Sequence, residues 1–358
     1  MFVLTPDFCI LNSSLSLVTD LLRTRHLSLV TRHYSCRVLV VTNLWPTEDD
    51  PGYGSFVQAQ MESLRPLGME WDVLFIDGRS SRWNYLRAAR EMRRQLKRKP
   101  YNLIHAHFGL SGWVARCQWR VPVVVSFMGD DVLGRLKRSG RITLYGRLLQ
   151  LSSFILARLV AAVIVKSPEM KSKLRLDSAH IVPNGVDLNL FRPLDPLEAR
   201  RTLGLDPRKK YVLYPYNPAE ERKRYDLLEA VVAHARQAVP ELEILHARGV
   251  PAARMPLYMN AADMLVLVSL AEGSPNAVKE AMATNLPVIT VDVGDTAELI
   301  GPTEGCYLVP REVEAVAARV VEVCRRGTRT RGREWIARLS IESVAKQIVA
   351  VYSSVVGQ

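Results

Sequence analysis

Short runs of apolar and β-branched residues alternate with helical patterns along the chain from residue 37 onward. In the first half, such runs predict strands at residues 37–43, 72–76, 103–106, 121–127 and 160–165. Apolar residues spaced three and four apart predict helices between these strands, the first at residues 56–67. Because strands joined by helices pair in parallel through right-handed crossovers, this half is predicted to form a parallel α/β sheet.

The alternation begins again after the loop Pro-Asn-Gly-Val-Asp at residues 183–187. The second set of predicted strands lies at residues 211–214, 242–246, 264–268, 287–291 and 306–309. The second set of predicted helices lies at residues 224–238, 256–261, 276–283 and 313–324. We therefore expect two α/β domains, residues 37–183 and 184–340. Ligands of such sheets bind beyond the carboxyl ends of the strands, so two facing domains predict a cleft between them.

The two ends of the chain lie outside this alternation. Residues 1–36 are predicted to be an N-terminal extension apart from the core. Asp7 and Asp20 interrupt the apolar stretch of this segment. It also lacks the positively charged segment that precedes the apolar region of a secretory signal, so it does not match such a signal. The amphipathic segment 341–358 is expected to form a helix that packs back across the junction onto the first domain.

The composition narrows the class of protein. The chain has 358 residues, 48% of them hydrophobic and 23% charged, and these values exclude a disordered or collagen-like protein. Five cysteines without a C-x-x-C pair argue against a disulfide framework and a structural zinc site, and favour a reducing compartment. The longest apolar run has 12 residues, at 154–165, with Arg158 inside it, and is too short to span a membrane. We expect a cytoplasmic protein, soluble or peripheral on the inner face of the membrane.

The net charge of +12 belongs to the first half of the chain. Residues 1–183 hold 26 Lys and Arg against 14 Asp and Glu, whereas residues 184–358 hold 22 of each kind. Basic residues cluster at 79–99 and again at 135–141. A surface of this kind binds nucleic acid, anionic lipid or a phosphorylated substrate, or it is a solvated helix face.

An amphipathic helix is predicted within the first basic cluster, at residues 83–99. Its apolar face is thin and consists of Leu86, Met92 and Leu96. A basic amphipathic helix suits binding at the interface of an anionic membrane, so a membrane surface is one expected partner.

The clearest candidate site is the segment 271–281, Ala-Glu-Gly-Ser-Pro-Asn-Ala-Val-Lys-Glu-Ala, which follows a predicted buried strand. Ser-Pro is a helix-start signal, so Glu272 falls on a loop at the carboxyl edge of the sheet and Glu280 about two turns into the helix. Carboxylates accept hydrogen bonds from sugar hydroxyls, and a helix N-terminus binds phosphate. A polyhydroxylated ligand with a diphosphate fits this arrangement, whereas each glutamate alone would be a solvated residue. The backbone N–H groups that would face the anion belong to Ser274, Asn276 and Ala277.

No mononucleotide-binding loop of the type G-x-x-x-x-G-K-[ST] or G-x-G-x-x-G occurs in the chain. The nearest piece is Pro-Gly-Tyr-Gly-Ser at residues 51–55, between the first predicted strand and the first predicted helix. Its glycines would let the backbone approach a phosphate, although an ordinary turn has the same composition.

Taken in order, several segments resemble the retaining family 4 glycosyltransferases, which have the two-domain GT-B fold. Glu272 and Glu280 match the family's E-x7-E element, and residues 37–43 with Gly54 are similar to its opening strand and glycine loop. The other similar segments are His-Ala-His-Phe-Gly at 105–109, and residues 126–131, 181–187 with 191–193, and 292–294 with 298–300. The resemblance implies two Rossmann-like domains that face each other across a cleft, the first for the acceptor and the second for the donor.

The resemblance also implies roles for individual residues. Glu280 would hold the ribose hydroxyls of a nucleotide diphosphate sugar, and Glu272 the hydroxyls of the transferred sugar. Lys223 would neutralise the diphosphate, and Gly54 would close on it. His107 would contact the donor sugar near the reacting centre. The remaining donor-binding positions would be Arg224, Gly273, Ser274, Asn276 and Ala277.

Two positions depart from the family pattern. Tyr-Asn-Pro-Ala at 216–219 stands where the family has Gly-Arg, so Arg222 or Arg224 would have to replace the arginine that binds the diphosphate. Met128 stands where a histidine is common in the family. The first histidine of the 105–109 segment, His105, is expected to be satisfied within the core.

The expected function is that of a retaining, metal-independent glycosyltransferase (EC 2.4) without a cofactor. The departing diphosphate would take the proton of the incoming hydroxyl, and fixed N–H groups with Lys223 would stabilise its charge. The acceptor would be a lipid-linked or polysaccharide glycan of the cell envelope. The alternative is a basic α/β protein that binds nucleic acid or another polyanion without catalysis. For the enzyme, we expect Glu272→Ala to abolish transfer with little loss of stability.

Overall fold

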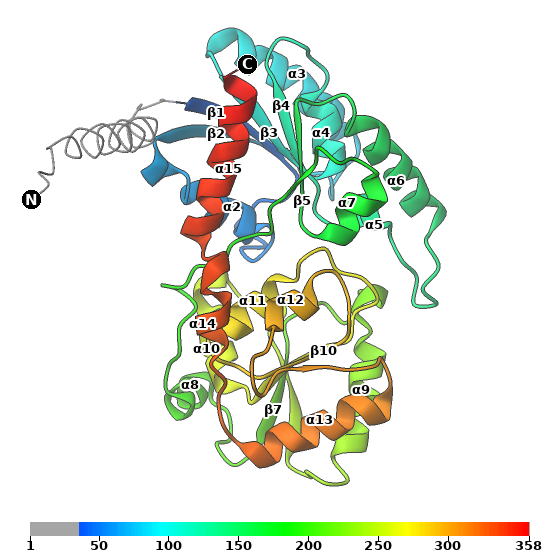
Figure 1. The fold of residues 1–358 in the computed structure, drawn as a ribbon, viewed down its shortest axis with the longest axis vertical. Helices are drawn as coiled ribbons and strands as arrows, with labels where there is room; N and C mark the ends of the chain where they lie inside the picture. Colours follow the sequence, from blue (N-terminus) through cyan, green and yellow to red (C-terminus); the bar gives the residue numbers. More distant parts are fainter. Residues whose placement is uncertain (1–35, 358) are drawn as a thin grey trace, which may run out of the picture.

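The computed structural model describes residues 36–357 (Figure 1). Two α/β domains lie one above the other in this view, the N-terminal domain in blue to green and the C-terminal domain mainly in yellow-green to orange. The predicted extension at residues 1–36 falls outside the described residues except for Cys36. This cysteine opens the first strand, which therefore begins one residue earlier than predicted.

Within the described residues, the N-terminal domain is built on one parallel six-stranded sheet. Its strands are β1 (Cys36–Thr42), β2 (Met69–Phe75), β3 (Leu103–His107), β4 (Val123–Ser126), β5 (Ala162–Val165) and β6 (His180–Ile181). Its helices are α2 (Ser55–Glu62), α3 (Trp83–Arg98), α4 (Gly109–Ala115), α5 (Asp130–Leu133), α6 (Leu144–Leu156) and α7 (Pro168–Leu174). The strand order β2-β1-β3-β4-β5-β6 contains all five predicted strands and adds β6, whose two exposed residues leave no apolar pattern.

The C-terminal domain repeats this plan with a parallel five-stranded sheet in the order β8-β7-β9-β10-β11. Its strands are β7 (Lys210–Tyr214), β8 (Leu242–His246), β9 (Met264–Leu267), β10 (Val288–Thr290) and β11 (Tyr307–Leu308). Its helices are α8 (Pro196–Leu203), α9 (Tyr225–Ala235), α10 (Met255–Ala261), α11 (Asn276–Ala283), α12 (Thr296–Ile300), α13 (Val313–Arg326) and α14 (Gly332–Ile336). Helix α15 (Ile341–Val356) ends the described chain. The two parallel sheets are the two Rossmann-like domains of a GT-B fold.

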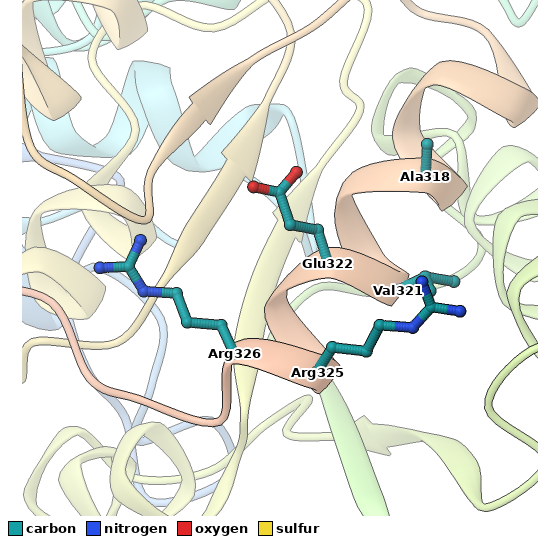
Figure 2. A pocket seen from close by; sticks show the side chains of 5 residues that line it. All are labelled: Ala318, Val321, Glu322, Arg325 and Arg326. Carbon is teal, nitrogen blue, oxygen red and sulfur yellow. The ribbon is translucent and has the colours of Figure 1, made fainter.

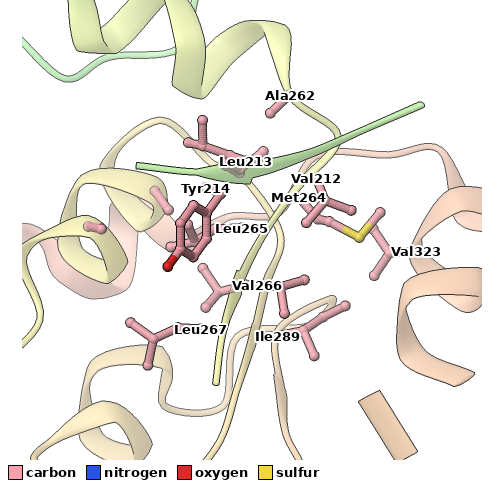
Figure 3. Packing of buried hydrophobic residues seen from close by; sticks show 14 of the residues in the cluster. Val212, Leu213, Tyr214, Ala262, Met264, Leu265, Val266, Leu267, Ile289 and Val323 are labelled. Carbon is pink, nitrogen blue, oxygen red and sulfur yellow. The ribbon is translucent and has the colours of Figure 1, made fainter. Parts of the chain in front are cut away.

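Each sheet is covered by helices on both faces, which is why its central strands are buried on both sides and mostly apolar. On β1, Leu39 and Val41 pack into one cluster with residues of α3 and α4, and Val38 and Val40 pack on the opposite face with α2 and α15. In the C-terminal domain, β9 lies at the centre of the core between β7 and β10 (Figure 3).

The chain passes between the domains twice, and the two crossing segments are paired. The Val186 N–H donates to the Leu339 carbonyl at 3.0 Å, and the Ile341 N–H donates to the Val186 carbonyl at 2.9 Å. Helix α15 then runs back along the N-terminal domain, in red in Figure 1. Its residues Val344, Ile348 and Tyr352 are buried in the same cluster as β1, β3 and β4. The last helix thus completes the core of the first domain.

Helix α3 does not present the apolar face that its sequence predicts. Met92 has no exposed surface, and Leu96 packs against the same core cluster. Of the three predicted apolar residues, Leu86 is the one that is exposed, at 57%. The apolar positions of α3 are mostly used to dock the helix on its own sheet, because a helix covering a sheet needs such a stripe.

Candidate active site

A cavity of about 740 Å³ lies between the two domains. Its lining from the N-terminal domain consists of Asp130, Arg135, Leu136, Lys137 and Thr143. Its lining from the C-terminal domain consists of Asn217, Ala219, Glu220, Glu221 and Arg222. The first set follows the carboxyl end of β4 and the second follows the carboxyl end of β7, so the cavity lies where parallel sheets bind ligands.

A second hollow of about 500 Å³ lies on the surface of α13, between Glu322, Arg325 and Arg326 (Figure 2). Glu322 already accepts a hydrogen bond from the Tyr307 hydroxyl at 2.7 Å. Helix α13 lies at the end of the C-terminal domain remote from the N-terminal domain (Figure 1), so this hollow is separate from the cleft.

The strand order of each sheet reverses at a point that borders the cleft. In the first sheet the reversal falls between β1 and β3, where Thr42 and His107 are partners in register. In the second sheet it falls between β7 and β9, and the loops after these strands carry Tyr216 and Glu272. Open α/β sheets bind ligands at such reversals. The predicted residues His107 and Glu272 therefore belong to the two ligand-binding ends of the sheets.

Glu272 is buried with two cations on its carboxylate. The Lys223 Nζ lies 2.7 Å from Oε1, and the Arg222 Nη1 lies 3.0 Å from Oε2. Burial alone would raise the pKa of Glu272, but the charges of Lys223 and Arg222 lower it to about 2. The carboxylate is therefore charged at neutral pH and holds both cations in place.

The predicted replacement for the family's arginine was either Arg222 or Arg224, and the structure separates them. Arg222 contacts Glu272 and also lies 3.4 Å from the Asp130 carboxylate, which belongs to the other domain. Arg224 has a left-handed backbone with φ of 54°, and its guanidinium pairs with Asp226 at 2.9 Å. Arg222 is thus the arginine beside Glu272, whereas Arg224, predicted as donor-binding, pairs outside that cluster.

Tyr216 lies beside the same cluster. The Lys223 Nζ sits 3.7 Å from the centre of the Tyr216 ring, as a cation–π contact. The Tyr216 hydroxyl is buried and has no hydrogen-bond partner among residues 36–357. Burial, followed by the negative charges of Glu272 and Glu280, raises its pKa well above 10, so the hydroxyl stays protonated. A buried donor without a partner is costly and is the kind of group that a ligand satisfies.

The beginning of α11 is tied to the linker between the domains. The Lys279 Nζ donates to the Asn184 carbonyl at 2.8 Å and to the Ser274 Oγ at 3.0 Å. The Asn184 amide in turn donates to the Asn276 side-chain oxygen at 3.3 Å. The side chains of Ser274 and Asn276 are therefore engaged within the protein. The N–H groups of Asn276 and Ala277, in the first turn of α11, have no helical acceptor and remain for an anion.

Glu280 lies on α11 as predicted, but about one turn from the start of the helix rather than the predicted two, because α11 begins only at Asn276. Its side chain is half-buried, and burial raises the pKa of Glu280 to about 7. The charges of Glu272 and Glu280 both act on the Tyr216 hydroxyl, so the three groups share one region. At neutral pH Glu272 is therefore fully charged, whereas Glu280 is only partly charged.

The two histidines of β3 have different surroundings. His105 Nδ1 lies 2.7 Å from the Tyr352 hydroxyl and Nε2 lies 2.8 Å from the Ser126 hydroxyl, which confirms a histidine satisfied within the core. His107 is also fully buried, with Nε2 3.1 Å from the Gln60 amide nitrogen and Nδ1 without a partner among the described residues. Burial lowers the pKa of His107 well below 6.5, so its ring is neutral. In this conformation the predicted donor-sugar contact of His107 is covered.

Two predicted glycines allow close backbone approaches. Gly54 has φ of 71°, and a Cβ there would lie 2.2 Å from the Leu44 carbonyl carbon. Gly273 has no such strain, but a Cβ would lie 3.1 Å from the Met170 sulfur and 3.4 Å from the Met128 carbonyl oxygen. A glycine is therefore required at position 54 by the conformation of its own loop. Gly273, by contrast, lies where the loop after β9 meets the N-terminal domain.

Sequence reasoning did not single out Lys279, and it noted Tyr216 only as a departure. Lys279 precedes Glu280 in a segment that is otherwise apolar on its buried face. No Asp or Glu stands three or four residues from Lys279, the spacing that would pair the two charges on the helix surface, and this was the available signal. Its burial and its contact with Asn184, 95 residues away, come from the domain arrangement and leave no local pattern.

Two features are absent from residues 36–357, namely a cluster of metal ligands and a membrane-spanning helix. No three His, Cys, Asp or Glu side chains in this part of the chain come close enough to share a metal ion. No helix in the described part is both long and apolar enough to cross a bilayer.

Family models match both domains. A model described as "Glycosyltransferase Family 4" matches residues 29–190, and a model described as "Glycosyl transferases group 1" matches residues 219–326. Together they cover the N-terminal domain and most of the C-terminal domain.

Among curated proteins, the chain is similar to a protein of Bacillus subtilis strain 168 named as the teichuronic acid biosynthesis glycosyltransferase TuaC. The two are 26% identical over 347 residues, which is 79% of this chain and 88% of that protein. It is also 27% identical to the D-inositol 3-phosphate glycosyltransferase of Segniliparus rotundus, over 70% of this chain and 66% of that protein.

Among solved structures, the chain resembles the sucrose-phosphate synthase of Thermosynechococcus elongatus with a TM-score of 0.72 and 19% identity. The alignment covers 89% of this chain and 98% of that one. It also resembles Anabaena HepE in complex with UDP and glucose, with a TM-score of 0.65 and 17% identity over 89% and 100% of the two chains. At these identities the likeness shows a shared fold.

Proposed function

This chain belongs to the group 1, family 4 glycosyltransferases and has their GT-B fold, and on that basis we propose how its cleft binds a donor and transfers a sugar. Glycosyltransferase activity with a nucleotide-sugar donor follows from the family. The finer proposal is a transfer with retention, without a metal ion or another cofactor, to a glycan of the cell envelope. The observation that carries it is the buried cluster of Glu272, Lys223 and Arg222 beside the first turn of α11.

The donor is proposed to lie across the loop after β9. Its diphosphate would meet the N–H groups of Asn276 and Ala277 together with Lys223 and Arg222, and its ribose would meet Glu280. The donor sugar would meet Glu272, and the unpartnered Tyr216 hydroxyl would donate to it or to the diphosphate. HepE, with the same fold, has been solved with UDP and glucose, so UDP is the first nucleotide to test.

The leaving group determines what the protein must stabilise. When the bond between the sugar C1 and the diphosphate oxygen breaks, negative charge develops on that oxygen, and preorganised N–H groups and cations lower the barrier. In the proposed retaining step, the same oxygen takes the proton of the acceptor hydroxyl while the acceptor oxygen bonds to C1 on the same face. The cations paired with Glu272 would do the work that a divalent metal does elsewhere.

His107 has no exposed surface in this conformation, so its proposed contact with the donor sugar requires a movement of the surrounding loops. Its neutral ring and unpartnered Nδ1 are suited to hydrogen bonding rather than to ion pairing. Gly54, on the loop before α2, is proposed to close toward the phosphate from the N-terminal domain.

The acceptor is proposed to be a lipid-linked or polysaccharide glycan. Two observations support an anionic or membrane-held acceptor, namely the name of the TuaC relative and the basic residues Arg135 and Lys137 on the acceptor side of the cavity. The enzyme is proposed to act in the cytoplasm, at the inner face of the membrane. The alternative of a polyanion-binding protein without catalysis receives no support from the comparisons.

The test of the site is Glu272→Gln, assayed for sugar transfer. The burial of Glu272 changes the expectation for the alanine variant, because removing the carboxylate from two cations costs about 3 kcal/mol of stability in a buried pair. Gln keeps the volume and one acceptor oxygen but releases Lys223 and Arg222, so we expect transfer to fall about 100-fold or more.

The matched control is Glu243→Gln, because Glu243 also pairs with a lysine, Lys209, but on β8 at the surface. It is expected to transfer at the wild-type rate. A Glu272→Gln variant that is folded and fully active would contradict the proposed site.

A further inference from the structure

Helix α6 exposes an apolar face that the fold does not use. Leu144, Leu148, Leu151 and Ile155 are 75%, 59%, 57% and 45% exposed, and their spacing of four, three and four residues places them on one side of the helix. We call these four residues the α6 face. The opposite side of α6 is already buried, through Gly146, Leu149, Ser153 and Leu156.

The α6 face is larger than the isolated apolar residues of an ordinary surface. Tyr145 and Phe154, 44% and 36% exposed, flank it, and Leu159, 39% exposed, continues it past the end of the helix. A helix on the surface of a globular protein normally has one apolar stripe, which faces the core, whereas α6 has a second one that faces outward. Contiguous exposed patches of this kind mark sites of contact with a protein or a membrane.

The charges along the chain segment that contains the α6 face are of one sign. Between Asp131 and Glu169 the chain has no Asp or Glu, and it carries seven Lys or Arg residues. Arg141 and Arg147 are exposed next to the face. Arg82 immediately precedes α3, and its guanidinium carbon lies 6.0 Å from the centre of the Tyr145 ring, so the basic helix α3 begins beside the start of α6.

These charges select the kind of partner. Two copies of this chain joined through their α6 faces would bring the same arginines together, and like charges oppose such a contact. A surface that offers both apolar volume and negative charge satisfies the leucines and the arginines together. The interface of a bilayer with anionic lipid headgroups has both properties.

We propose that the α6 face is a membrane-docking surface that inserts into the interface of an anionic lipid bilayer. The proposal rests on the proposed function and specifies its acceptor side. Thr143, which caps α6 by accepting a hydrogen bond from the Gly146 N–H, also lines the cavity between the domains. Docking through α6 therefore holds the rim of the cavity at the lipid surface, where the headgroup of a lipid-linked acceptor lies.

The experiment is flotation of the full chain with vesicles, without donor or acceptor. One set contains phosphatidylglycerol and phosphatidylcholine in equal parts, and the other contains phosphatidylcholine alone. Wild-type protein is expected to float with the anionic vesicles and to bind them at least ten times more tightly than the neutral ones. Equal binding to both sets, or no binding to either, overturns the proposal.

The variant is Leu148→Glu with Leu151→Glu, and the matched control is Leu197→Glu, an exposed leucine on α8 with 53% exposure. The double variant is expected to lose at least tenfold in vesicle binding while the control binds like wild type. A second variant, Arg141→Gln with Arg147→Gln, retains the leucines and is expected to weaken binding to the anionic vesicles alone. Wild-type binding by the first variant overturns the proposal, and thermal unfolding checks that each variant is folded.

Two further outcomes are informative. If wild type is a dimer that the leucine variant converts to a monomer, and vesicles do not bind, the α6 face is a contact between copies and the proposal fails. Glu272→Gln is expected to bind vesicles like wild type while losing transfer, so failure of the docking surface and failure of the catalytic site are read separately.

Discussion

At the scale of single residues, Glu280 is the residue of the cleft whose ionisation is expected to change near neutral pH. Burial raises its pKa to about 7, above the value of about 4.3 for an exposed glutamate. The folded state therefore holds this proton while the unfolded chain has lost it. Between about pH 4 and pH 7 the burial of Glu280 makes the protein less stable as the pH rises.

The same pKa predicts how nucleotide binding depends on pH. If the charged carboxylate accepts from the ribose hydroxyls, the dissociation constant of the nucleotide rises about tenfold as the pH falls from 8 to 6. The Glu280→Gln variant has no such proton, so its dissociation constant should follow only the ionisation of the nucleotide and of other groups. Calorimetric titrations of both proteins at several pH values test this. If the dissociation constants of the two proteins changed with pH in the same way, Glu280 would not be part of the nucleotide site.

At the level of single residues, the sequence was informative where a role depends on local spacing. Glu272 and Glu280 were found because one loop and one helix start place them, and both lie in the predicted elements. The partners of these residues could not be found in this way. Arg222 was one of two options, and the burial of Tyr216 and Lys279 depends on segments distant in the chain.

The last helix shows how one element stabilises another domain. Tyr352 on α15 lies 2.7 Å from His105 Nδ1 on β3, and both side chains are buried. In Tyr352→Phe, the imidazole nitrogen loses its partner in a dry environment, which costs about 1–3 kcal/mol. We therefore expect the N-terminal domain to unfold at a lower urea concentration than in the wild type. Urea titrations monitored by circular dichroism measure this, and they are analysed for separate transitions of the two domains.

The control for this variant is Tyr101→Phe, which removes a phenol that donates to Asp72 at 2.8 Å in a partly exposed site. Water can replace that bond, so the loss should be smaller than for Tyr352→Phe. If both variants lose the same stability, the buried contact between α15 and β3 contributes nothing special to the first domain.

At the level of elements, the sequence predicted the central strands and the helices with one apolar stripe. It missed β6, which has two exposed residues, and it did not single out α6, although α6 exposes more apolar side chains than the predicted apolar face of α3 does. Apolar residues occur on two opposite sides of α6, so spacing alone does not say which side faces the sheet. Only the packed structure shows that Leu149 and Leu156 face inward while Leu148 and Leu151 do not.

At the scale of the whole molecule, the two domains differ in net charge and in the residues that they contribute to the cleft. The excess of 12 positive charges belongs to residues 1–183, whereas residues 184–358 are balanced. The balanced domain holds Glu272, Glu280 and the start of α11. Arg222 and Asp130 face each other across the cleft at 3.4 Å, so the loop after β7 and the basic domain are already in contact.

The central claim is that the C-terminal domain binds a nucleotide without a metal ion, and thermal unfolding with UDP, GDP, ADP and dTDP, each with and without EDTA, tests it most directly. A nucleotide at about 100 times its dissociation constant stabilises the folded state by about 2.7 kcal/mol, which is a shift of several degrees for domains of this size. We expect one nucleotide, UDP first, to raise the unfolding midpoint equally with and without EDTA, and to raise the midpoint of Glu280→Gln by a smaller amount. No shift with any nucleotide, together with a shift by heparin or DNA, would contradict the account and favour a polyanion-binding protein.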